Sequence, residues 1–272
     1  APLLCAAVLI EIVYLLRILH GVRRKAFSKG VSGIMVIVWI VFIAWELATT
    51  KTAALGIVLY PSPENVFAVY PQYAKQMLEN AVFSLEVLGT GFLGGILVGI
   101  VLGLIVGWVP RLRCIFYPIA KVMAPIPPMI YAPYLIILMP TFRIASIVLV
   151  GILIFMFTFL EMVSKVGSID KNIIDSARMM GLSTPTMIFR VLLPYLYPTV
   201  ATGLKTQLPT AMLMLVMAEM YGATSGLGYF VINYTNYANY TNVVAGIIMV
   251  GIVVTILDFL VGLLVRKTVK WS

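Results

Sequence analysis

The chain has 272 residues, of which 62% are hydrophobic and 11% charged, and its formal net charge is +9. Soluble domains carry about 25% charged residues, so this composition excludes an ordinary soluble domain and favours an all-α integral membrane protein. The positive charge does not indicate a nucleic-acid partner, because the basic residues stand in short blocks at the ends of apolar stretches, where they encode membrane topology.

Apolar stretches long enough to cross a bilayer recur along the chain. About 18 nearly uncharged apolar residues suffice for one crossing, and we expect spans at residues 2–19, 31–49, 83–107, 115–139, 143–163, 196–220 and 243–265. We interpret the first as a retained helix rather than a cleaved signal, because it contains Glu11 and lacks a basic start.

Lysine and arginine are distributed unevenly between the two sides of these spans. Only Lys51, Lys75 and Arg143 fall on one side, and the other basic residues fall on the opposite side or just inside a span end, as Lys121 and Lys205 do. Basic residues are retained in the cytoplasm. We therefore expect a multi-pass protein of the plasma (bacterial inner) membrane whose connection at residues 164–195 is cytoplasmic.

Two spans carry distinctive residues. In 83–107 a glycine recurs at every fourth position from Gly91 to Gly107, which predicts a helix face that packs closely on another helix. Span 115–139 contains five prolines, and each internal proline removes a backbone hydrogen bond. Such a broken helix is tolerated against protein or a water-filled cavity. We expect Pro125, Pro127, Met129 and Tyr131 to line a transport pathway. A kinked helix that only packs against other helices is the alternative.

Recognisable catalytic and metal-binding motifs are absent from the sequence. It contains no Gly-Lys dipeptide and therefore no Walker A loop, and its single histidine and two cysteines form no metal pattern. We expect no catalytic residue, no metal site and no cofactor in this chain. Glu219 lies in a span, where ionisable groups are costly and often functional, so it is a further pathway candidate, with a structural role equally open.

The stretch DSARMMGLSTPTMIFRVLLP, residues 175–194, is a polar segment between two spans. Asp170 is placed to cap a helix, and Gly181 supplies the left-handed residue that ends one. Ser183 or Thr184 then caps a second short helix with Pro185 in its first turn. The pattern predicts two short helices around a glycine. Ile169, Ile173, Ile174, Ala177 and Met180 follow helical spacing and form an apolar stripe. A single helix lying in the headgroups would explain this stripe but not the caps and the hinge together.

This segment resembles the EAA motif of permease subunits of bacterial ATP-binding-cassette (ABC) importers. The resemblance covers roughly residues 58–271 and includes YPSPENVF, VPRLR, PIPPMIYAP, AEMYGATSGLGY and VRKTVKW. It is similar to the branch that imports nitrate, sulfonate, taurine and bicarbonate. Two departures stand out: the usual Glu-Ala-Ala reads Asp175-Ser176-Ala177, and Arg143 stands in an outer turn where an acid is common.

The resemblance implies a type I ABC importer transmembrane domain, with a six-helix core at residues 31–272 and an extra N-terminal helix and basic loop at 1–30. It implies a second permease chain, expected to be identical, two cytoplasmic ATPase subunits that bind ATP and Mg, and an external solute-binding protein. The segment at 164–195 would then hold the coupling helix. The implied ATPase-docking residues are Asp175, Ala177, Arg178, Met180, Gly181, Leu182 and Pro185.

Two other classes of protein stay open on the sequence alone. An ion-coupled secondary transporter also uses broken helices, but ion coupling calls for acids or histidines within the membrane. A membrane-embedded enzyme would require a nucleophile–base pair or a metal set, and the sequence shows neither pattern.

Overall fold

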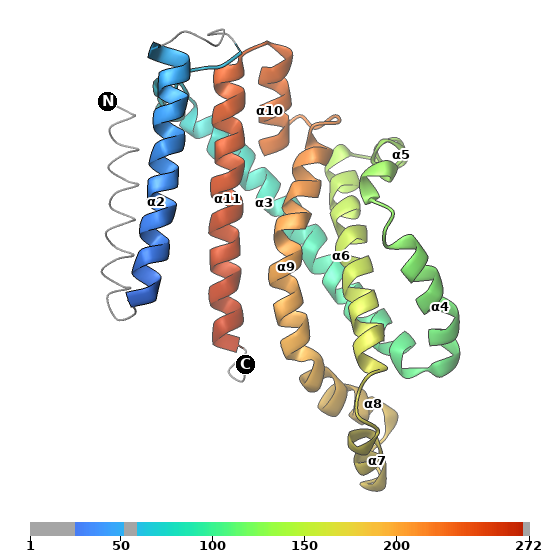
Figure 1. The fold of residues 1–272 in the computed structure, drawn as a ribbon. Coiled ribbons are helices and arrows are strands. Elements are labelled where there is room, and N and C mark those ends of the chain that lie inside the picture. Colours follow the sequence, from blue (N-terminus) through green and yellow to red (C-terminus); the bar gives the residue numbers. More distant parts are fainter. Residues whose placement is uncertain (1–24, 52–58, 269–272) are drawn as a thin grey trace. The chain divides into compact units, whose positions relative to one another are not determined.

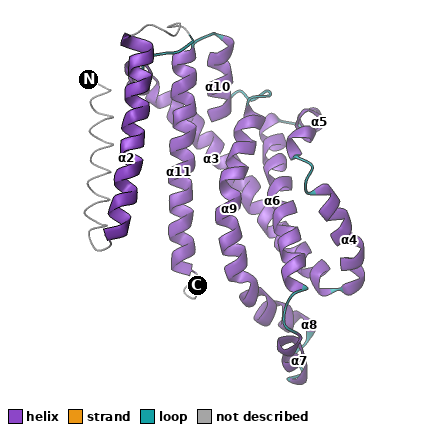
Figure 2. Cartoon of the chain, in the orientation of Figure 1, coloured by secondary structure: helices purple, strands orange, loops and turns teal. Residues whose placement is uncertain are grey.

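The computed structural model describes residues 25–51 and 59–268, and each regular element in these ranges is a helix (Figure 1; Figure 2). The expected first span at 2–19 lies outside the described residues. The chain divides into two compact units: residues up to Glu79 together with Phe230–Val250, and Asn80–Tyr229 together with the residues from Gly251.

Among the described residues, 4 helices are long and apolar enough to cross a membrane. They are α3 (Pro63–Trp108), α6 (Phe142–Val166), the continuous helical stretch Thr184–Glu219, and Tyr240–Lys267 within α11 (Tyr240–Thr268). These helices confirm the spans expected at 83–107, 143–163, 196–220 and 243–265. The span expected at 31–49 falls in α2 (Lys25–Glu46) and a π-helical turn, Leu47–Lys51, of which Val36–Thr50 is a shorter apolar helix.

The span expected at 115–139 is broken, as its prolines predict. It consists of α4 (Pro110–Met123), a 3₁₀ turn (η2, Pro128–Tyr131) and α5 (Ala132–Leu138). The axis bends by 81° between Met123 and Pro128. Pro125, Pro127 and Pro128 supply no backbone N–H across this break, so the α-helical ladder cannot continue through it.

The first unit is held by apolar packing around the start of α3. Val66, Val69 and Met77 form a core with Phe230 and Ala245, from α10 (Leu227–Asn236) and α11. Hydrogen bonds tie the ends of this core, because the Tyr70 hydroxyl donates to the Ala245 carbonyl (3.0 Å) and the Trp45 indole to the Pro61 carbonyl (3.0 Å).

The second unit is built on close packing of α3 against α6, and each glycine of the α3 stripe faces that helix. A Cβ on Gly95 would lie 2.6 Å from the Gly151 carbonyl oxygen, and one on Gly99 would lie 2.8 Å from the Thr158 Cβ. Neither distance is compatible with a side chain. The stripe therefore lets two backbones approach at membrane depth, which confirms the packing face expected from the sequence.

Two boundaries differ from expectation. Residues 63–82, which precede the span expected at 83–107, are the first part of the 46-residue helix α3. The second short helix expected after Gly181 is not separate from the span expected at 196–220. Instead α8 (Thr184–Thr186) runs through a π-helical turn, η3 (Met187–Leu192), into α9 (Leu193–Glu219). Pro194 lies within this continuous helical stretch, directly after the π-helical turn.

Candidate functional site

The connection between α6 and α9 begins with the capped helix α7 (Lys171–Met179). The Asn172 N–H donates to the Asp170 carboxylate at 2.9 Å, and the Ile173 N–H donates to the Asp170 carbonyl at 3.1 Å. Asp170 thus satisfies backbone donors that have no partner within the helix. The cap expected from the sequence is confirmed.

Gly181 turns the chain between α7 and α8. Its φ is +71°, in the left-handed region that residues with a Cβ rarely adopt. The Leu182 N–H reaches back to the Ala177 carbonyl at 3.5 Å and the Met180 N–H to the Ser176 carbonyl at 3.2 Å, as at a glycine-terminated helix end. A Cβ on Gly181 would meet nothing within 4 Å, so the requirement for glycine comes from the backbone conformation alone.

We refer to α7, Gly181 and α8 together as the corner. The side of the corner that faces the membrane helices packs within the second unit. Ile169 and Ala177 are buried with Met187 and Leu192 in one cluster, which also includes Leu104 of α3 and the other buried residues Met162, Val166 and Leu196. This cluster joins the corner to three membrane-spanning helices. A displacement of α7 would therefore be transmitted to α3, α6 and α9 through packed side chains.

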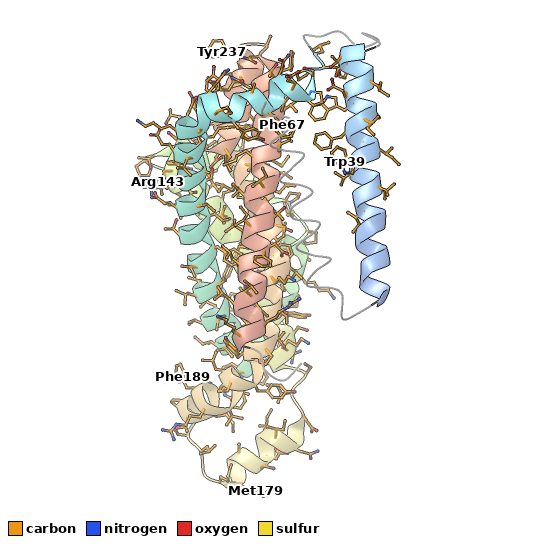
Figure 3. The ribbon with its side chains drawn as sticks, turned by 90° about the vertical axis from the view of Figure 1, so that its left-hand side faces the viewer. Trp39, Phe67, Arg143, Met179, Phe189 and Tyr237 are labelled. Carbon is orange, nitrogen blue, oxygen red and sulfur yellow. The ribbon has the colours of Figure 1, made fainter. Side chains whose placement is uncertain are left out.

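The tip of the corner is apolar and exposed. Met179 is 84% exposed and Met180 70%, and Phe189 is 67% exposed on the turn that follows α8. In Figure 1, α7 and α8 extend beyond the ends of α6 and α9, and Figure 3 shows Met179 at the far end of this extension. Exposed methionines are frequent on protein-binding surfaces because their side chains adapt to a partner.

The structure places the nominated docking residues in different environments. Asp175, Met180 and Pro185 are exposed, Leu182 is half-buried, and Ala177 is buried in the chain's own core. Met180 was expected on the apolar stripe of α7, and its exposure corrects that part of the prediction. The side chain of Arg178 lies outside the described residues. The docking role of these residues stays a prediction.

The break between α4 and η2 adjoins a cavity of about 260 Å³. Of the residues nominated for the pathway, Tyr131 lines it, while Pro125 and Pro127 are exposed and Met129 is half-buried. The facing wall is supplied by α6, through residues that include Ile152, Phe155 and Met156. The cavity lining is apolar except for the tyrosine. Whether a solute passes here stays a prediction.

Glu219, at the end of α9, is fully buried and hydrogen-bonded on both carboxylate oxygens. The Ser84 hydroxyl donates to Oε1 at 2.6 Å, and the Gly228 N–H donates to Oε2 at 2.7 Å. Ser84 in turn accepts the Leu227 N–H at 2.9 Å. The carboxylate thus lies at the first backbone donors of α10, where a negative charge is stabilised. Its pathway role stays a prediction, and these contacts support the structural alternative.

Two glycines make room for this carboxylate. Gly226 has a φ of +119°, and a Cβ there would collide with the Glu219 carboxylate. A Cβ on Gly228 would collide with the Val216 carbonyl. Asn80 completes the network by accepting the Gly226 N–H at 2.9 Å. Sequence reasoning missed Asn80 and Ser84, which are remote in the chain, although the Gly-Leu-Gly spacing after Glu219 was a usable signal.

The described residues form a helical membrane fold with a broken span, and a helix–glycine–helix corner packs against three of the spans. These features are typical of the transmembrane subunit of a transporter. Residues 95–270, more than half of the chain, match the family described as the binding-protein-dependent transport system inner membrane component. The chain belongs to this family, whose members are permease subunits of ABC importers.

Several relatives extend over nearly the whole chain. It is 26% identical to the taurine transport system permease protein TauC of Escherichia coli and 24% identical to the putative aliphatic sulfonates transport permease protein SsuC of Bacillus subtilis. Each alignment covers 92% of this chain and 90% of the relative. The nitrate import permease protein NrtB of Leptolyngbya laminosa is 28% identical over 68% of this chain and 67% of the relative.

The fold is also similar to a solved structure. A chain of the MetNI methionine ABC transporter in an inward-facing conformation matches with a TM-score of 0.58 and 21% identity. The match covers 74% of this chain and 97% of that chain. This likeness confirms the expected fold of a type I ABC importer transmembrane domain.

Proposed function

We propose that the corner formed by α7, Gly181 and α8 is the coupling element of an importer and docks in cytoplasmic ATPase subunits. The proposal rests on the different surroundings of the two sides of this corner. Its rear packs on α3, α6 and α9 through Ala177 and Met187, and its tip exposes Met179 and Met180. A partner that binds the tip can therefore move the membrane helices as a rigid body.

The assembly that this role requires contains a second permease chain, two ATPases with bound ATP and Mg, and an external binding protein. Family membership supports such partners, and the sixteen-to-three asymmetry of lysine and arginine in the sequence supports a cytoplasmic corner. The solutes for which these relatives are named, taurine, sulfonates and nitrate, each carry an ionised group rich in oxygen. The solute proposed for this chain is accordingly a small oxyanion.

Gly181 provides the test of the coupling role. Gly181→Val should abolish ATP-driven uptake and the stable retention of the ATPase, because a β-branched residue resists a φ of +71°. Gly181→Asn is the matched control and should retain most of both, since asparagine tolerates the left-handed region. Membrane insertion of both variants should equal that of the wild type.

The measurement is gentle co-purification of each variant, with mass spectrometry for a protein that carries a Walker A motif, followed by uptake in reconstituted vesicles. A screen of oxyanions against the co-purified binding protein identifies the solute. Normal ATP-driven uptake by the Gly181→Val variant would contradict the coupling role. Uptake that collapses with an uncoupler while ATP stays high would instead favour the secondary transporter.

A further inference from the structure

A pocket of about 380 Å³ lies where α3 turns into α4, beside the end of α6. The ends of α3 and α6 are in direct contact, because a Cβ on Gly107 would lie 2.8 Å from the Val166 Cβ. In Figure 1, this turn lies near the end of α6 from which the chain continues toward α7. The residues that line the pocket are Gly107, Pro110, Arg113, Cys114, Tyr117 and Pro118.

The charged side chain of the pocket, Arg113, is held in place by its surroundings. Its guanidinium lies against Gly167, the residue directly after α6, where a Cβ would collide with it. The guanidinium also lies 5.9 Å from the centre of the Tyr117 ring, and that ring packs against the buried residues Phe159 and Val163 of α6. A guanidinium that is already positioned loses little conformational freedom when it binds a ligand.

Arg113 has no acidic partner among the described residues, because neither of their two ion pairs involves it. The acids nearest to it in the sequence are Glu86, Glu161 and Asp170. Glu86 is in an ion pair at the opposite end of the span. Glu161 is directed at α9, where a Cβ on Gly203 would lie 2.6 Å from its Oε2, and Asp170 caps α7. The positive charge in the pocket is therefore not neutralised by these carboxylates.

The backbone at the end of α6 does not explain the position of the guanidinium either. The Val163 and Lys165 carbonyls there accept the Gly167 and Ser168 N–H groups, at 3.3 and 3.1 Å. Within the described residues, the guanidinium that makes a hydrogen bond is that of Arg143. The five N–H donors of the Arg113 guanidinium are therefore available to a ligand with several acceptor oxygens.

The pocket lies at the level of the membrane surface. Arg113 falls between the spans expected at 83–107 and 115–139, and Trp108 and Tyr117 beside it are half-buried aromatic residues of the kind that mark the headgroup level. The nearby charged residues Arg111 and Lys165 are exposed and basic. This end of the helices is the one proposed as cytoplasmic, and the cytoplasmic leaflet carries anionic lipids that such residues attract.

We propose that this pocket binds the phosphate group of an anionic phospholipid of the inner leaflet and that Arg113 is its ligand. A guanidinium matches phosphate because two parallel N–H groups reach two of its oxygens. Free phosphate offers the same oxygens, but a pocket at headgroup level with proline and tyrosine in its wall suits the phosphate and glycerol of a lipid. The bound headgroup would contact Gly167, four positions before α7, and so hold the helix end from which the corner begins.

Cys114 provides a native reporter, because it is exposed and lines the pocket. The full chain with Cys5→Ser is placed in vesicles of phosphatidylcholine, with or without phosphatidylglycerol, and the rate of its reaction with uncharged N-ethylmaleimide is measured. The control combines Cys114→Ser with Ser164→Cys, because Ser164 is exposed on α6 near the same membrane surface but does not line the pocket. Phosphatidylglycerol should slow Cys114 at least about threefold more than the control, as expected for an occupied site. Equal slowing would overturn the site, since the surface potential acts on both thiols.

Substitution of the arginines distinguishes a site from general attraction to the membrane. Arg113→Gln should raise the phosphatidylglycerol content needed for half-protection by about tenfold, as expected for the loss of a charge-assisted contact. Arg111→Gln removes the same charge outside the pocket and should shift it by less than about twofold. Equal shifts in the two variants would overturn the role of Arg113. If Arg113→Gln lowers the thermal midpoint, Arg113→Lys replaces it and should give an intermediate shift, because the charge remains without the paired N–H groups; no shift would again overturn that role.

Inorganic phosphate identifies the source of the ligand. In vesicles of phosphatidylcholine alone, added phosphate should leave the rate at Cys114 unchanged, because the site is expected to require the lipid. Protection by phosphate equal to that by phosphatidylglycerol would overturn the assignment to a lipid. These measurements need neither ATP turnover nor docking of α7. A failed Gly181 test would therefore reject the coupling proposal and leave the lipid site intact.

Discussion

Glu219 and Lys205 are ionisable residues of the same membrane helix with opposite environments. Glu219 is fully buried, and each of its carboxylate oxygens accepts a hydrogen bond, from Ser84 and from Gly228. Lys205 is exposed, and its ammonium faces the bare backbone at Gly262. The difference teaches that depth in the membrane does not by itself mark a functional charge. A buried carboxylate that is hydrogen-bonded on both oxygens organises the fold, whereas an exposed lysine just inside a span end contributes to membrane topology.

The largest expected effect comes from removing the satisfied charge. Glu219→Ala leaves the Gly228 N–H buried without an acceptor and opens a cavity, which should lower the free energy of unfolding by about 3 kcal/mol. Lys205→Ala should leave the thermal midpoint unchanged, because it removes no contact that the fold requires. Thermal unfolding of the two purified variants in detergent makes the comparison. Equal losses of stability would show that the two charges do not differ in kind.

Two neighbouring glycines of α3 allow the same comparison without a charge, because one contacts the rest of the chain and the other does not. A Cβ on Gly95 would lie 2.6 Å from the Gly151 carbonyl oxygen, whereas one on Gly94 would meet nothing within 4 Å. Gly95→Ala should therefore destabilise the chain by about 2 kcal/mol through overpacking. Gly94→Ala should cause no loss, because alanine favours a helix more than glycine does. Loss of stability in both variants, measured by thermal unfolding, would contradict a packing face confined to the stripe.

Ser84→Ala probes the donors around Glu219 one at a time. The variant removes one hydrogen bond to the carboxylate and leaves the Leu227 N–H without its acceptor. Because Gly228 still donates to Glu219, the loss should be about 1 to 2 kcal/mol and smaller than that of Glu219→Ala. The double variant should lose less than the sum of the two single losses, since both remove one shared contact. Full additivity in unfolding measurements would show that the two side chains act independently.

The sequence predicts what depends on neighbouring residues and fails where the partner is remote. The Asp170 cap and the left-handed Gly181 follow from residues a few positions apart, and both are found. Ser84 and Glu219 are 135 positions apart, so no periodicity connects them. The contact of Lys205 with α11 at Gly262 likewise joins residues that are remote in the sequence. The sequence predicted a separate short helix after Gly181, whereas α8 continues through a π-helical turn into α9 and Pro194 does not interrupt the helix.

Arg143 differs from both Glu219 and Lys205, because it is an exposed charged residue with a charged partner. Its substitution should cause the smallest of the losses of stability predicted here. Its guanidinium pairs with the Glu86 carboxylate at 2.8 Å, but the two side chains are 50% and 53% exposed. Arg143→Gln should lower the free energy of unfolding by less than about 1 kcal/mol, since exposed pairs are screened and weakly stabilising. The difference from the wild type should shrink further between low and high salt. A loss as large as that of Ser84→Ala, insensitive to salt, would place this pair with Glu219 among the charges that organise the fold.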